Sequence, residues 1–150
     1  MKSPFVRLYL LATAFTLAVT AAAKLPVIFH GPNRCIEDAI LGDWQPDFLS
    51  NQGLLGIAAA VEVMIVLLIC FSPWHWLPCL ACAVWGTLCV VCRLWLMDPN
   101  ANCRCLGWLA KPGLTTNLMV GALAFAIALG GWLAFKRTLQ AASKNIQASA

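Results

Sequence analysis

The stretch LLGIAAAVEVMIVLLICF, residues 54–71, decides the fold of this chain. It is apolar throughout except for Glu62, which lies near its middle. A helix needs about 20 mainly apolar residues to cross the hydrocarbon layer of a membrane. The apolar residues are continuous rather than alternating, so the stretch predicts a transmembrane helix and not a strand of a barrel.

Three further apolar runs, at about 5–23, 77–97 and 117–135, have the same character. The whole chain is 61% hydrophobic and 11% charged, whereas soluble domains are about half apolar and a quarter charged. We therefore predict a single all-α domain, residues 1–150, that forms an integral membrane four-helix bundle. The first run resembles a secretory signal, but it is longer than a usual signal core, and we expect it to be retained.

Basic residues predict the orientation of the bundle. They lie beside the first and the last run, at Lys2, Arg7, Lys136 and Arg137. Because cytoplasmic flanks carry an excess of Lys and Arg, we expect both termini in the cytoplasm. The polar segments 24–53 and 98–116 would then face outward. The chain has no basic stripe with interleaved aromatic residues, which argues against a nucleic-acid partner.

A polar turn, Cys103-Arg104-Cys105-Leu106-Gly107, carries the sharpest chemical signal. Two thiols one residue apart can close a tight ring, and strain makes such a disulfide easier to reduce. Arg104 favours the reactive thiolate. Cys35, in the other outer segment, supplies a third thiol that can resolve a mixed disulfide. We interpret Cys103 and Cys105 as a redox pair. The alternatives are a static disulfide and a soft-metal site for Cu(I) that includes Met97.

The third run holds two more cysteine pairs. Cys79 and Cys82 follow Pro78, and a helix N-terminus stabilises a thiolate. The predicted orientation places them near the cytoplasm, where thiols stay reduced, so packing as small apolar side chains is the favoured interpretation. Packing is also favoured for Cys89 and Cys92. The alternative is that Cys92 passes electrons to a membrane quinone.

Glu62 is a candidate functional residue because a carboxylate inside a membrane is costly and needs a partner. Lys24, at the end of the first run, and Arg93, near the end of the third, are the two candidate partners. The pair would either fix the bundle or handle protons beside the thiols.

Three features together resemble the MauE/DoxX family of redox-associated membrane proteins over about residues 5–135. They are Ala23-Lys24-Leu25, Val61-Glu62-Val63 and the Cys-Arg-Cys-Leu-Gly turn, in which Leu106 stands where the family often has Phe. The resemblance implies a DoxX-like four-helix bundle. It also implies the formation or maintenance of disulfides in exported proteins with a thioredoxin-like partner, as in methylamine utilisation.

We therefore predict a membrane thiol–disulfide redox protein of the bacterial inner membrane whose site residues are Cys103, Cys105, Cys35, Glu62 and Lys24. Electrons would pass to or from an extracytoplasmic thioredoxin-like protein or a quinone. Two alternatives remain. One is a small four-helix carrier in which Glu62 binds a cation or a proton. The other is a non-enzymatic assembly subunit with structural cysteines.

Overall fold

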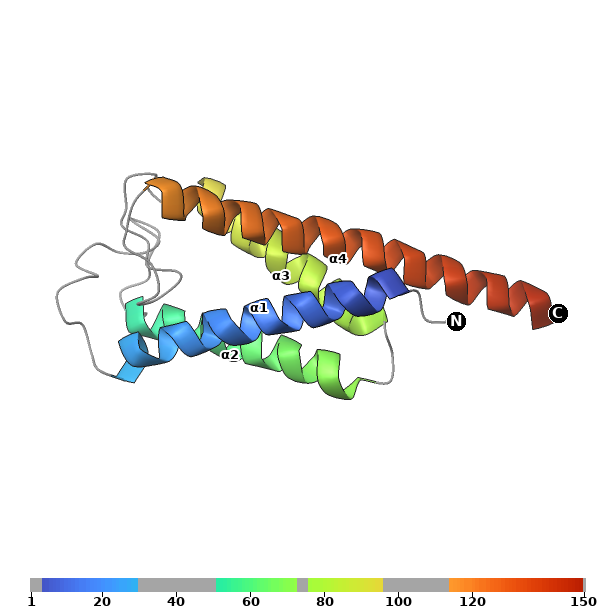
Figure 1. Ribbon diagram of the computed structural model, residues 1–150, viewed down its shortest axis with the longest axis horizontal. Helices are drawn as coiled ribbons and strands as arrows, with labels where there is room; N and C mark the ends of the chain where they lie inside the picture. The colour runs from blue at the N-terminus through green and yellow to red at the C-terminus, as the bar shows by residue number, and fades with distance from the viewer. Residues whose placement is uncertain (1–3, 30–50, 73–75, 96–113, 150) are drawn as a thin grey trace.

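The computed structural model describes residues 4–29, 51–72, 76–95 and 114–149, and these ranges are almost entirely helical. They form four α-helices: α1 (Pro4–Phe29), α2 (Asn51–Phe71), α3 (Trp76–Trp95) and α4 (Leu114–Ser149). Consecutive helices run antiparallel, so the described part of the chain is an up-and-down bundle (Figure 1). The predicted all-α class and the four helices are confirmed.

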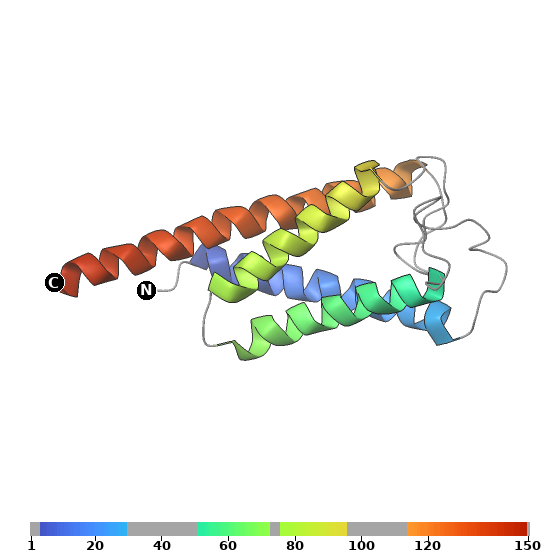
Figure 2. The same cartoon turned by 180° about the vertical axis from the view of Figure 1, so that it is seen from behind.

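The bundle consists of two helix pairs. Helix α1 packs along α2, and α3 packs along α4, while contacts between the two pairs are far fewer. Figures 1 and 2 show the two pairs from opposite sides. They are joined near the beginning of α1, where the Tyr9 hydroxyl donates a 2.7 Å hydrogen bond to the carbonyl oxygen of Ile127 in α4. In the same region the Arg137 guanidinium lies 4.3 Å from the ring centroid of Phe5.

Three of these helices are long and apolar enough to cross a membrane, at Pro4–Pro26, Gln52–Phe71 and Leu118–Ser143. The apolar part of α3 is shorter, Trp76–Cys92. Large apolar side chains cover the outside of the helices, for example Leu8, Phe15, Met64, Leu94 and Leu118. In water such a surface would be unfavourable, whereas lipid tails are as apolar as these side chains. The fold is therefore that of a membrane protein.

Two helices extend further than the sequence predicted. Helix α1 reaches Phe29 rather than residue 23, because the apolar run continues beyond Lys24. Helix α4 reaches Ser149, whereas the predicted apolar run ended at about residue 135. The segment 136–149 is polar, but it contains neither Gly nor Pro, and it includes Ala, Gln, Leu, Lys and Arg, which favour helix. The charged residues after 135 therefore did not end the helix, and the apolar span found in α4 runs from Leu118 to Ser143.

Small residues bring α3 and α4 unusually close together. Cys79, Cys82 and Ala83 are completely buried on α3. A Cβ atom added at Gly86 would lie 2.5 Å from the backbone nitrogen of Ala128, and one added at Gly131 would lie 2.6 Å from that of Ala83. These contacts show close packing of α3 against α4, since small residues let helix backbones approach.

We predict that Gly86→Ala and Gly131→Ala each destabilise the protein by about 1–3 kcal/mol, the usual penalty for overpacking. The added methyl group meets backbone atoms that cannot rotate away, so the two helices must separate. The measurement is thermal unfolding of the purified protein in detergent. Gly56→Ala is the matched control, because nothing lies within 4 Å of its added Cβ. Equal melting temperatures for all three variants would contradict the close approach of α3 and α4.

Candidate functional site

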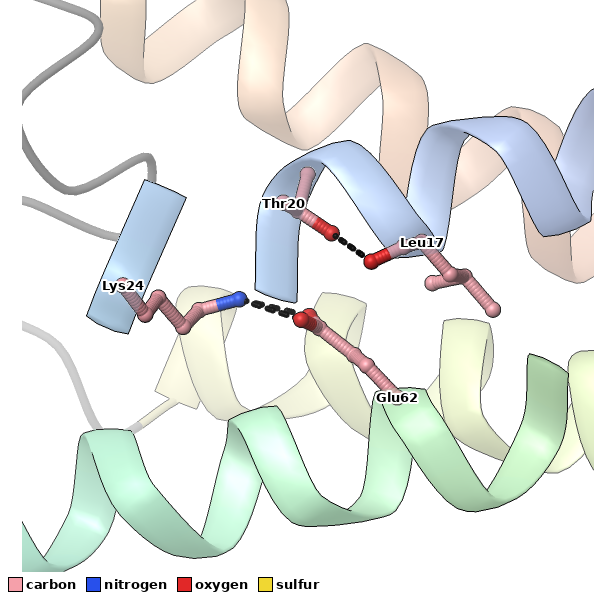
Figure 3. A network of polar contacts seen from close by, with 4 residues as sticks. All are labelled: Leu17, Thr20, Lys24 and Glu62. Atoms are coloured by element: carbon pink, nitrogen blue, oxygen red, sulfur yellow. Dashed lines mark hydrogen bonds and ion pairs between the residues drawn. The ribbon is translucent and has the colours of Figure 1, made fainter. Parts of the chain in front are cut away.

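A buried ion pair joins α1 and α2. The Lys24 ammonium, near the end of α1, lies 2.6 Å from each of the two carboxylate oxygens of Glu62, in the middle of α2 (Figure 3). The side chains are only 5% and 8% exposed. The pairing of Glu62 with Lys24 was one of two suggested by the sequence. The side chain of Arg93, the other candidate, lies outside the described part of the structure.

The burial of this pair makes each partner depend on the other. A single charge in an apolar interior loses its hydration, and an opposite charge in direct contact restores part of that energy. The hydroxyl of Thr20, one turn before Lys24, donates to the carbonyl oxygen of Leu17 at 3.0 Å and is thus directed to its own helix (Figure 3). The carboxylate and the ammonium therefore compensate each other across the α1–α2 interface.

Helix α3 adds thiols to the surroundings of the ion pair. Cys89 is half-buried and interacts electrostatically with Glu62, with Lys24 and with Cys92. Cys92 is also half-buried. The charges of the ion pair in α1 and α2 therefore act on the Cys89 thiol of α3. The sequence named these three residues, but it did not show that α3 brings Cys89 near the ion pair.

The cysteines at the beginning of α3 have a different environment. Cys79 and Cys82 are completely buried free thiols in the main apolar core. The Tyr9 hydroxyl lies beside the Cys82 thiol, and both belong to the contact between the two helix pairs. This burial agrees with the packing interpretation. Sequence reasoning missed Tyr9, although a tyrosine within an apolar run needs a partner for its hydroxyl.

The predicted redox cysteines Cys35, Cys103 and Cys105 lie outside the described residues. The helix ends that flank their segments are nevertheless informative. The end of α1, the beginning of α2, the end of α3 and the beginning of α4 all lie at the same end of the bundle (Figure 1). Lys24 is five residues from the end of α1 (Phe29), so the ion pair is closer to this end than to the other. Among the described residues, no group of three or more His, Cys, Asp or Glu side chains could hold a metal ion.

Comparisons with protein-family models, with curated proteins and with solved structures found no match to this chain. The resemblance to the MauE/DoxX family therefore rests on the residues quoted above. Two of the three segments quoted for the resemblance contain Lys24 and Glu62, and the side chains of these two residues are in direct contact.

We predict that Lys24→Met destabilises the protein by about 3–5 kcal/mol, because it leaves a buried carboxylate without its counter-ion. The double variant Lys24→Met/Glu62→Leu should recover much of this loss, since it removes both charges. The measurement is a double-mutant cycle of unfolding free energies, in which the two single losses should not add.

Lys136→Met is the matched control, because this lysine is exposed on α4. It should leave the melting temperature nearly unchanged. Additive effects of the Lys24 and Glu62 substitutions would show that the two side chains do not stabilise each other.

Proposed function

We propose that this protein exchanges thiols and disulfides at the outer face of the bacterial inner membrane and so forms or maintains disulfides in exported proteins. One observation supports this most. Both cysteine-bearing segments, 30–50 and 96–113, are joined to helix ends at one end of the bundle (Figure 1). That arrangement brings the attachment points of Cys35 and of the Cys103–Cys105 pair to one side of the membrane. The activity would be of the MauE/DoxX type.

The proposed chemistry uses two exchange steps. A thiolate of the exported protein attacks the Cys103–Cys105 disulfide, that S–S bond breaks, and a mixed disulfide forms while one cysteine leaves as a thiolate. A second thiolate of the substrate then attacks the mixed disulfide. The substrate gains a disulfide, and the Cys103–Cys105 pair gains two electrons and, after protonation, two protons. A thioredoxin-like partner with an oxidised Cys pair would accept these electrons by the reverse exchange, and Cys35 would resolve the intermediate.

The ion pair has a supporting role in this proposal. Lys24 and Glu62 hold α1 against α2 in the half of the bundle nearer the cysteine-bearing segments. They thereby fix the end of α1 and the beginning of α2, which segment 30–50 connects. Cytoplasmic termini, the inner-membrane location and the thioredoxin-like partner belong to the same proposal.

A second candidate function is a small carrier that binds a cation or a proton at Glu62. The buried carboxylate favours it. However, the ammonium of Lys24 contacts both carboxylate oxygens, so a cation could bind only after Lys24 had moved away. Transport would then depend on Glu62 and not on the cysteines, which separates this function from thiol exchange.

We predict that Cys103 and Cys105 occur as a mixture of reduced and oxidised forms in cells. One of the variants Cys35→Ser, Cys103→Ser and Cys105→Ser should accumulate a mixed disulfide with a partner protein, because the thiol that resolves this mixed disulfide is absent. The measurement is acid trapping of intact cells, followed by thiol labelling and mass spectrometry of the trapped adduct. A membrane-impermeant maleimide, applied to intact cells, determines which side each cysteine faces.

Cys70→Ser is a matched control, since this exposed free thiol near the end of α2 belongs to neither segment. The Cys70→Ser variant should form the same disulfide adducts as the parent protein. A Cys103–Cys105 disulfide that stays fully oxidised in the parent protein and in Cys70→Ser, with no trapped adduct in the other variants, would identify a static structural disulfide. Loss of function in Glu62→Gln with a silent Cys103→Ser would favour the carrier.

A further inference from the structure

The charges of this chain are divided between the two ends of the bundle. Arg7, Lys136 and Arg137 are exposed near the beginning of α1 and in the later part of α4, which lie together (Figure 1). We call this region the basic end. Five of the six acidic residues of the chain belong to segments 30–50 and 96–113, which are joined to the opposite end of the bundle. The described helices thus supply no acidic residue at the basic end.

These cations have no counter-ion within the described part of the chain. Glu62 is the one acidic residue in the described ranges, and Lys24 contacts both of its carboxylate oxygens. Lys136 and Arg137 nevertheless lie inside the apolar span Leu118–Ser143 of α4, where an unpaired charge is costly. An anion from the surroundings of the bundle would offset this cost.

The crossing of α1 and α4 holds the Arg137 guanidinium in place. This group lies 4.3 Å from the ring centroid of Phe5, and it has no hydrogen bond to another described residue. One turn further along α1, the Tyr9 hydroxyl donates to the carbonyl oxygen of Ile127, and the Tyr9 ring occupies the space that a side chain at Gly130 would need. The guanidinium is therefore positioned by its ring contact, while its N–H groups remain available to bind oxygen atoms.

Exposed apolar side chains continue from Arg137 into the membrane. Leu133 and Leu129 lie one turn and about two turns before Arg137 on α4, and both are exposed. On α1, Leu8 lies one turn after Phe5 and is also exposed. Residues four apart share a face of a helix, so the cation stands at one end of an apolar surface. A phospholipid has the same order of groups, with a charged phosphate above its acyl chains.

We infer that the α1–α4 crossing at the basic end binds an anionic phospholipid. Its phosphate accepts hydrogen bonds from the Arg137 guanidinium, which suits a bidentate contact with phosphate oxygens, and Lys136 adds a second positive charge. Its acyl chains lie along Leu133 and Leu8. A soluble anion would satisfy the charges but would leave this apolar surface without a partner, whereas a lipid matches both. The inference does not depend on thiol exchange at the other end of the bundle.

The test is native mass spectrometry of the full-length protein in a neutral detergent, titrated with dioleoyl phosphatidylglycerol. Dioleoyl phosphatidylcholine has the same acyl chains without a net charge, and glycerol 3-phosphate has the phosphate without the acyl chains. We expect phosphatidylglycerol to bind more tightly than phosphatidylcholine, and glycerol 3-phosphate not to displace it. Both comparisons follow from a site that needs the charge and the apolar surface together.

Arg137→Gln and Lys136→Gln should each weaken the binding of phosphatidylglycerol about fivefold, the effect of one basic residue near an anionic lipid surface. Lys136→Gln leaves the ring contact of Arg137 intact, so it tests the charge even if Arg137→Gln disturbs the crossing. Phe5→Leu should weaken this binding about two- to fivefold through loss of the cation–π contact, and should leave phosphatidylcholine binding unchanged. Lys111→Gln is the matched control, because it removes the same charge from segment 96–113, and it should bind as the parent protein does.

Three results would overturn the inference. The first is equal affinity for phosphatidylglycerol and phosphatidylcholine, which would show that the cations do not select an anionic lipid. The second is displacement of phosphatidylglycerol by glycerol 3-phosphate, which would identify a site for a soluble phosphate. The third is a loss of affinity in Lys111→Gln as large as that in Arg137→Gln, which would show an effect of net charge without a site at the basic end.

Discussion

The cost of an unpaired charge in an apolar interior is the constraint on which this bundle depends. Glu62 lies in the middle of α2, and it is stable there because Lys24 reaches it from α1 at 2.6 Å. An ion pair with both carboxylate oxygens engaged tolerates little sliding of one helix along the other (Figure 3). The charges therefore set the register of α1 against α2, and with it the positions of the helix ends that flank segment 30–50.

The other helix pair is held together by a different means. Helices α3 and α4 approach until Gly86 and Gly131 leave no room for a side chain. Dispersion between closely packed backbones replaces the ionic contact there. One contact between the two pairs is at Tyr9, whose hydroxyl donates a hydrogen bond to a backbone carbonyl oxygen of α4. The α1–α2 pair is thus held by an ion pair and the α3–α4 pair by close packing. The charges of Lys24 and Glu62 act on Cys89 of α3.

The sequence predicted the helices well and the contacts between them only in part. Four apolar runs gave four helices, because backbone groups in lipid must bond within their own segment. Glu62 and Lys24 could be identified, since charges in apolar runs are rare, but Lys24 and Arg93 were equally good partners until side-chain directions were known. The end of α4 was missed because polarity marks the end of a span rather than of a helix. The proximity of Cys89 to the ion pair depends on how α3 packs against α2, which periodicity alone does not specify.

The pairwise arrangement has a consequence for biosynthesis. Lys24 and Glu62 are 38 residues apart, so the ribosome adds the second charge roughly 2–8 s after the first at about 5–20 residues per second. Helices α1 and α2 can enter the membrane as one hairpin that carries no net charge in its interior. Gly86 and Gly131 let helices α3 and α4 pack closely against each other, and these two helices can follow as a second hairpin. Lys24 and Glu62 can therefore pair as soon as α2 has been synthesised, before α3 and α4 are made.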